Sequence, residues 1–177
     1  DKISINARSS AGWAKTFMSI ETGGYVGVQL FEGYTPADTQ QLVNHSDSVL
    51  LYTDKRLYDN MDIENMPNLI GVIDVRSGEL LASRNGFDAI YAKRQQLFDE
   101  KYPNGMKTED VFYQDRDADD VCGINYTSGS TGSPKGVMLT IRNFSTNVYF
   151  LPLHFPFTED GDYLSVLPFA HIFGLTC

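Results

Sequence analysis

Small and hydroxyl-bearing residues surround a single lysine in the stretch of this sequence with the clearest chemistry. Between Tyr126 and Gly136 the chain holds three glycines, five serines or threonines, and Lys135. Glycines can adopt positive φ, so that successive N–H groups point into one concavity and receive phosphate oxygens. Hydroxyls add rotatable donors, and lysine adds a mobile positive charge. The stretch predicts a phosphate-binding loop made by Thr127, Ser128, Gly129, Ser130, Thr131, Gly132, Ser133, Lys135 and Gly136.

Two other interpretations of this stretch fit the residues less well. A Walker A loop reads G-x-x-x-x-G-K-[ST], but Pro134 stands where the glycine before the lysine should be, and Gly136 replaces the Mg²⁺-binding hydroxyl. A flexible Gly/Ser linker is the common alternative, but this stretch lies between two apolar strand patterns. We therefore expect phosphate binding without the P-loop NTPase fold.

The composition of the 177 residues, 42% of them hydrophobic, is that of a globular domain. Fourteen basic against 23 acidic residues give a net charge of −9, which disfavours nucleic acid as a partner. Residues 99–120 hold much of the acid and predict a solvated connection. Cys122 and Cys177 lie in no C-x-x-C spacing, which favours a reducing compartment, and we predict the cytoplasm.

No apolar run is long enough for a transmembrane span, although peripheral contact with a membrane stays compatible with the sequence. The chain starts without Met and stops inside an apolar stretch, so we expect both ends to be cut. Asp115 to Asp120 imitates an EF-hand, but Asp120 replaces the required glycine and Tyr126 the closing glutamate, so no metal site is predicted. His45 and His154 are expected to be core histidines.

The elements that must position the predicted loop alternate between strand and helix. A doubly wound, mostly parallel α/β sheet flanked by helices follows, with ligands expected at the carboxyl ends of the strands. Strands are predicted over 2–7, 25–30, 48–52, 69–75, 121–126, 137–139 and 163–167.

Four helices are predicted from caps and apolar spacing. Ser9 or Ser10 caps a helix carrying Trp13, Phe17 and Ile20, and Thr35-Pro36 starts a helix running to about residue 45. The apolar stripe of a third helix, ended by a Pro-Asn-Gly sequence, consists of Phe87, Ile90, Tyr91, Leu97 and Phe98. The fourth helix begins after Thr140 and ends near residue 150, because Pro152 and Pro156 break a longer one. The aromatic residues around it are expected to pack in a core or against a partner.

The stretch 126–136 resembles the signature loop of the adenylate-forming superfamily, which includes acyl-CoA synthetases, peptide-synthetase adenylation domains and luciferases. Residues 167–174 resemble its L-P-x-x-H-x-x-G segment, and residues 13–28 are weakly similar to its early helix and strand. The resemblance implies that residues 1–177 are a truncated amino-terminal AMP-binding domain without its carboxy-terminal domain.

The resemblance also implies a reaction: ATP and a carboxylic acid give acyl-adenylate and pyrophosphate, and CoA then gives a thioester, with Mg²⁺ as cofactor. Lys135 and His171 would be the catalytic residues, His171 lining the acyl pocket. Phe169-Ala170 before His171 favours a long-chain fatty-acid–CoA ligase, since amino-acid-activating members usually place an Asp nearby. A non-catalytic phosphate-binding module, an aryl-CoA ligase and an adenylation domain stay open as alternatives.

Overall fold

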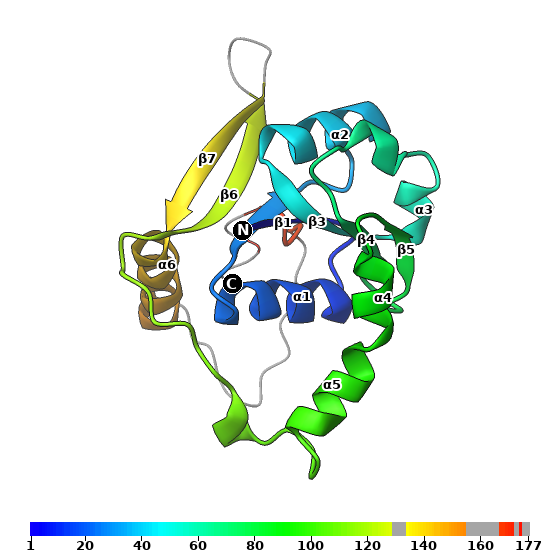
Figure 1. The fold of residues 1–177 in the computed structure, drawn as a ribbon. Coiled ribbons are helices and arrows are strands. Elements are labelled where there is room, and N and C mark those ends of the chain that lie inside the picture. The colour runs from blue at the N-terminus through cyan, green and yellow to red at the C-terminus, as the bar shows by residue number, and fades with distance from the viewer. Residues whose placement is uncertain (129–133, 155–166, 172–173, 175–177) are drawn as a thin grey trace.

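The computed structural model describes residues 1–128, 134–154, 167–171 and 174 (Figure 1). Within this part of the chain, seven strands form one sheet in the order β5-β4-β3-β1-β2-β6-β7. The five inner strands are parallel, whereas β5 and β7 pair antiparallel at the two edges. The strands are β1 (Lys2–Asn6), β2 (Val26–Leu30), β3 (Ser48–Thr53), β4 (Gly71–Asp74), β5 (Leu80–Ser83), β6 (Val121–Ser128) and β7 (Pro134–Thr140). The predicted fold class is confirmed.

The helices cover both faces of the sheet, with α1 on one face and α2 on the other (Figure 1). They are α1 (Ala11–Thr22), α2 (Pro36–His45), α3 (Lys55–Tyr58), α4 (Phe87–Ala92), α5 (Arg94–Lys101) and α6 (Ile141–His154), with 3-10 turns at Ile63–Asn65 and Thr108–Asp110. None of the helices in the described residues is long and apolar enough to cross a membrane.

The first two helices begin and end where the sequence predicts. The Ser10 hydroxyl accepts a hydrogen bond from the Trp13 N–H at 3.2 Å, and α1 ends before Gly24, whose φ is 74°. At α2 the Thr35 hydroxyl caps the Asp38 N–H, with Pro36 in the first turn. These caps fix the starts of the two helices that connect β1 to β2 and β2 to β3, three strands that lie side by side in the sheet.

Each face of the sheet carries its own core, because side chains alternate along the strands. Ile3 and Ile5 of β1 point toward α1, where they pack with Trp13 and Phe17. On the opposite face, Leu42 and Val43 of α2 pack against Val28, Leu30 and Leu51 of the strands, in a cluster that reaches Ile124 of β6. Burial on both faces explains the apolar runs of the inner strands.

Beyond residue 75 the structure departs from the prediction in both strands and helices. Strand β5 was not predicted; a turn at Gly78, with φ of 68°, folds it back on β4. The single helix over the stripe from Phe87 is two helices, α4 and α5, separated at Lys93, and the stripe is not buried: Ile90 is 62% and Leu97 52% exposed.

The last helix also differs from the prediction, because α6 continues through Pro152 to His154. The proline lies in its final turn, where little of the helix remains to be broken. Residues 163–166 of the last predicted strand lie outside the described residues, as do Phe155, Pro156 and Phe157. Leu167 lies in a bend.

Candidate functional site

The predicted phosphate-binding loop is the end of a β-hairpin. Strand β6 continues past Tyr126 to Ser128, and β7 begins at Pro134, so the prediction that the loop opens at Thr127 and the next strand starts at Val137 is wrong. Thr127 lies opposite Lys135, and Ser128 opposite Pro134. The difference arises because pairing of the two arms continues until the turn interrupts it, which no local pattern reveals. The predicted residues Gly129, Ser130, Thr131, Gly132 and Ser133 lie outside the described residues.

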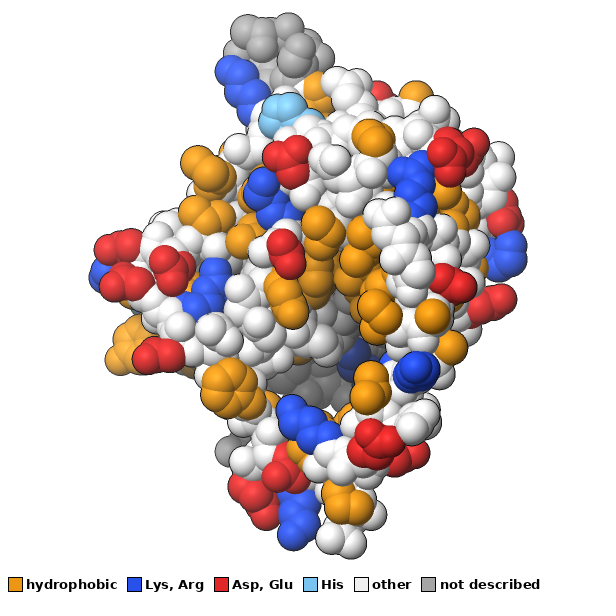
Figure 2. Space-filling view, viewed as in Figure 1, with side chains coloured by type: hydrophobic (Ala, Val, Ile, Leu, Met, Phe, Trp, Pro, Cys, Tyr) orange, Lys and Arg blue, Asp and Glu red, His pale blue; other side chains and the backbone are white. Residues whose placement is uncertain are grey.

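The two arms present a lysine and a hydroxyl side by side. Lys135 and Thr127 are both exposed and are register partners next to the turn. Lys135 can therefore place a mobile positive charge beside the Thr127 hydroxyl at this end of the hairpin. A basic side chain is visible at the top of the molecule in Figure 2.

Gly136 does not have the positive φ expected of it, since it lies within β7. Its small size nevertheless avoids a tight contact with the neighbouring strand. A Cβ atom at this position would lie 3.1 Å from Ile124 Cγ2 and 3.4 Å from Tyr126 Cε1. The glycine therefore makes space for the neighbouring strand.

The histidine segment lies against the same strand. The Asn125 side-chain amide donates to the Ala170 carbonyl at 2.7 Å, and the His171 N–H donates to the Pro168 carbonyl at 2.9 Å. His171 is exposed, at a turn. The structure thus connects the root of the hairpin to the residue preceding His171.

The segment is also fixed to the start of α1. The Phe169 N–H donates to the Ser9 hydroxyl at 2.9 Å, and the Phe169 ring lies 5.5 Å from the Trp13 ring. Trp13 Nε1 and Asn125 Oδ1 are buried without a hydrogen-bond partner among the described residues. The carboxyl ends of β1 and β6 therefore meet the histidine segment, as expected of a ligand edge in a parallel sheet.

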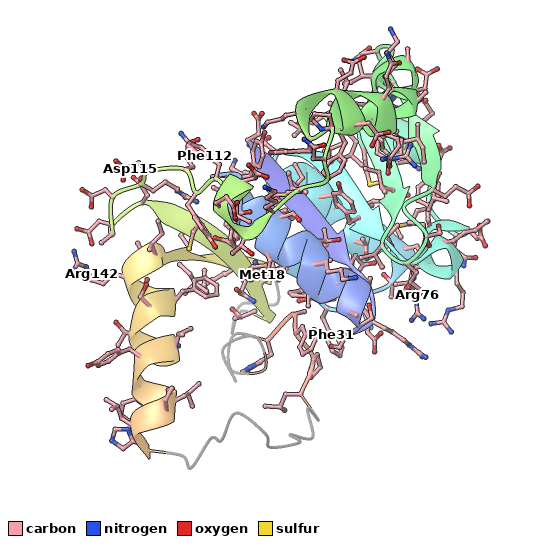
Figure 3. All side chains as sticks on the ribbon, turned by 90° about the horizontal axis from the view of Figure 1, so that it is seen from below. Met18, Phe31, Arg76, Phe112, Asp115 and Arg142 are labelled. Carbon is pink, nitrogen blue, oxygen red and sulfur yellow. The ribbon has the colours of Figure 1, made fainter. Side chains whose placement is uncertain are left out.

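Two buried carboxylates hold the loops after the neighbouring strands. Asp54 accepts from the Arg8 N–H at 3.0 Å and from Arg76 Nε at 2.7 Å. Burial would raise the pKa of Asp74, but hydrogen bonds from Ser77, Lys55 and Arg76 outweigh it and lower this pKa. Figure 3 shows Arg76 and Phe31 near the start of α1, at this edge of the sheet.

Sequence reasoning missed two contributors to the site. Asn125 could have been found, because it is an amide inside the apolar run Ile124-Asn125-Tyr126. His45 was expected in the core; it is instead exposed at the end of α2, with Nδ1 2.8 Å from the Tyr126 hydroxyl. His154 is likewise exposed rather than buried, with Nδ1 2.9 Å from the Phe150 carbonyl. No spacing in the sequence connects residue 45 with residue 126.

The described residues contain no group of three or more His, Cys, Asp or Glu side chains that could hold a metal ion. Mg²⁺, which the resemblance implies, needs no such group, because one or two carboxylates together with the phosphates of a nucleotide commonly hold it. The hydroxyl and ammonium groups at the hairpin fit a phosphate, since both donate hydrogen bonds.

Comparison with known proteins identifies the family of the chain. The model of the family described as AMP-binding enzyme matches residues 1–177. A long-chain-fatty-acid–CoA ligase of Saccharomyces cerevisiae is 30% identical over 197 residues, covering 99% of this chain and 28% of the relative. The chain thus spans little more than a quarter of that relative's length.

Two solved structures have the same fold. A long-chain-fatty-acid-CoA ligase from Archaeoglobus fulgidus aligns with a TM-score of 0.73 at 20% identity, over 99% of this chain and 32% of that one. O-succinylbenzoate coenzyme A synthetase from Bacillus subtilis, in complex with AMP, aligns with a TM-score of 0.67 at 22% identity, over 99% and 39%. The chain belongs to the family of AMP-binding enzymes.

Proposed function

We propose that this chain is the first part of an enzyme that uses ATP to activate a carboxylic acid, first as acyl-adenylate and then as CoA thioester. The observation that carries the proposal is the pairing of Thr127 with Lys135 at the end of an exposed hairpin, in a chain of the AMP-binding family. The chain covers 28% of its yeast relative, so we assign the complete reaction to a longer protein. The carboxy-terminal domain of that longer protein is part of the proposal and rests on the family resemblance.

The hairpin would act on the leaving group of the first step. A carboxylate oxygen of the acid attacks the α-phosphorus of ATP, the bond to the bridging oxygen breaks, and pyrophosphate leaves with that electron pair. Negative charge therefore grows on the β- and γ-phosphates in the transition state. Lys135, the Thr127 hydroxyl and the amides of residues 129–133 would neutralise this charge.

His171 would lie at the acyl side of the same reaction. Its backbone is held at a turn, and Asn125 fixes the preceding Ala170 to the strand that leads into the hairpin. An imidazole there can donate a hydrogen bond to the carboxylate of the acid. In the second step the CoA thiolate attacks the acyl carbonyl and AMP leaves. The role of CoA rests on the family resemblance.

For the acid we propose a long-chain fatty acid, and for the location the cytoplasm. The fatty acid is supported by the yeast relative at 30% identity and by Phe169-Ala170 before His171. The location is supported by a sequence with two cysteines in no disulfide framework.

The test is exchange of labelled pyrophosphate into ATP by the longer enzyme, with hexadecanoate, 2-succinylbenzoate, benzoate and an amino acid offered separately. We expect exchange only when an acid is present, and the highest kcat/KM with hexadecanoate. A preference for an aromatic acid would overturn the fatty-acid proposal but keep the activity. Absence of exchange with every acid would favour a phosphate-binding module without catalysis.

A further inference from the structure

The arms of the hairpin extend beyond the sheet that supports them. Strand β6 pairs with β2 only from Gly123 to Asn125, where Gln29 is the last partner. From Tyr126 onward, β6 pairs with β7 alone. The part of the hairpin next to the turn therefore needs another attachment to the body of the protein if its direction is to be fixed.

Tyr126 supplies that attachment in the described part of the chain. Its hydroxyl lies 2.8 Å from His45 Nδ1 at the end of α2, and the two rings meet edge to face with centroids 5.7 Å apart. Its backbone carbonyl accepts a hydrogen bond from the Tyr34 hydroxyl at 3.4 Å. Tyr126 and Tyr34 both pack against the core cluster under α2. One residue before Thr127, the chain is thus tied to α2 and to the loop that precedes it.

The other arm is fitted to the same tyrosine. Gly136 is the register partner of Tyr126, and a Cβ atom there would lie 3.4 Å from the Tyr126 ring. Burial, with the Asp47 carboxylate nearby, raises the pKa of Tyr126, so its hydroxyl keeps its proton at neutral pH. The ring therefore remains a neutral hydrogen-bonding group between α2 and β7.

We infer that Tyr34, His45 and Tyr126 form a positioning clamp that sets the direction of the hairpin and so the place of Lys135. This inference rests on the proposed function. The three residues touch no reacting atom; they act through the strand that carries Thr127. A shift of about 1 Å in a group that stabilises a transition state can lower a rate a hundredfold, so small rotations at this root matter.

The test compares four substitutions in the longer enzyme. His45→Leu removes the hydrogen bond between the two side chains, whereas Tyr126→Phe removes it together with the longer contact of the Tyr126 hydroxyl with the Leu42 carbonyl at 3.5 Å. In the double variant the shared hydrogen bond is already absent, so its loss should equal that of Tyr126→Phe alone. His45→Asn restores an amide close to the position of Nδ1, with both a donor and an acceptor. His154→Leu is the matched control, because His154 is also exposed at the end of a helix, with Nδ1 on a carbonyl.

Two measurements are made on each variant: the maximal rate of acid-dependent pyrophosphate exchange and the hydrogen–deuterium exchange of the hairpin arms. We expect His45→Leu to slow the rate by about three- to tenfold, the loss typical of one hydrogen bond, and Tyr126→Phe and the double variant to slow it by at least as much and equally. KM for the acid should stay unchanged, deuterium uptake in the arms should rise, and His45→Asn should recover most of the rate. His154→Leu should match the wild type.

Wild-type rates in His45→Leu and Tyr126→Phe, with unchanged deuterium uptake, would overturn the clamp. So would a loss that His45→Asn does not recover, or one that raises KM for the acid as strongly as it lowers the rate. If the wild-type enzyme exchanges no pyrophosphate with any acid, the proposed function fails, while the deuterium uptake still decides whether the clamp holds the hairpin.

Discussion

Helices α1 and α6 carry similar apolar patterns but have different surroundings. In α1 the side chains of Trp13, Phe17 and Ile20 are buried against the sheet. In α6, which has 14 residues, Leu151 is the one buried side chain among those that the structure describes. Phe150 and Leu153 of α6 are 51% and 65% exposed. A hollow of about 950 Å³ runs along this exposed face. The comparison shows that an amphipathic pattern specifies a helix, while its contribution to stability depends on what the rest of the fold places against it.

The largest expected effect is at Trp13, which is fully buried and contacts Phe17 and Phe169. Trp13→Ala should lower the free energy of unfolding by about 4 kcal/mol, because a large aromatic side chain leaves a cavity. Met18→Ala is the control on the same helix: Met18 is 57% exposed, on the outer side of α1 (Figure 3), and should cost about 0.5 kcal/mol or less. Urea unfolding measures both. Equal losses of unfolding free energy in the two variants would show that burial of Trp13 against the sheet does not stabilise α1.

Helix α1 also carries a partly buried carboxylate, Glu21, and the described side chains of α6 include no carboxylate. Burial raises the pKa of Glu21 from 4.5 to about 7, despite the opposing effects of Arg116 and Cys122. Since the folded state binds the proton more tightly than the unfolded state, stability is lost as the pH rises from about 4.5 through 7. At the start of α6, Arg142 Nε forms an ion pair with Asp119 Oδ1 at 2.8 Å. This pair is exposed and should contribute little to the free energy of unfolding.

Glu21→Gln should therefore stabilise the protein in a pH-dependent way. We expect little difference from the wild type near pH 4 and a gain of about 3 kcal/mol at pH 8, since one pKa unit corresponds to about 1.4 kcal/mol. Urea unfolding at the two pH values checks this. A gain that is the same at both would mean that the carboxyl group is not held protonated by the fold.

At the hairpin the expected effect is on rate rather than stability. Lys135→Ala in the longer enzyme should lower the maximal rate of acid-dependent pyrophosphate exchange about a hundredfold, with a smaller effect on KM for the acid. Its melting temperature should be unchanged, because Lys135 is exposed. Lys93→Ala, another exposed lysine, provides the control. A rate equal to that of the control would remove Lys135 from the proposed chemistry.

The smallest effect is expected on α6. Phe150→Ala should change the free energy of unfolding by about 0.5 kcal/mol or less, since its ring contacts His154 at the surface. Phe17→Ala, the equivalent change on α1, should cost about 3 kcal/mol or more. Similar losses from the two phenylalanines, measured by urea unfolding, would contradict the contrast between the two helices.

The sequence was sufficient wherever local signals and burial agree. The caps at Ser10 and Thr35 and the apolar strands predicted the first three strands and two helices with small errors at their ends. Prediction failed where pairing partners decide: β5 exists because β4 is beside it, and β7 begins at Pro134 because β6 continues opposite. The apolar stripe from Phe87 correctly predicted helical structure, but its side chains stay largely exposed because few of the described residues pack against it.

The site was predictable in part for the same reason. Residues that are close in sequence, such as Thr127 and Lys135, were identified together from their types. Contacts between distant segments could not be predicted. The hydrogen bonds of Asn125 with Ala170 and of His45 with Tyr126 correspond to no motif or spacing in the sequence. These contacts follow from the order of strands, which places β6 beside β2.

The position of β7 at the border of the sheet has a consequence for solubility. Among the described residues β7 pairs with β6 alone, so one row of its backbone groups has no partner strand, and Met138 is 67% exposed there. Its first residue is Pro134, which has no N–H to offer, and its second is a cation. Both features disfavour the addition of a strand from a second molecule, so we expect the lysine that would attract phosphate also to limit aggregation along this border.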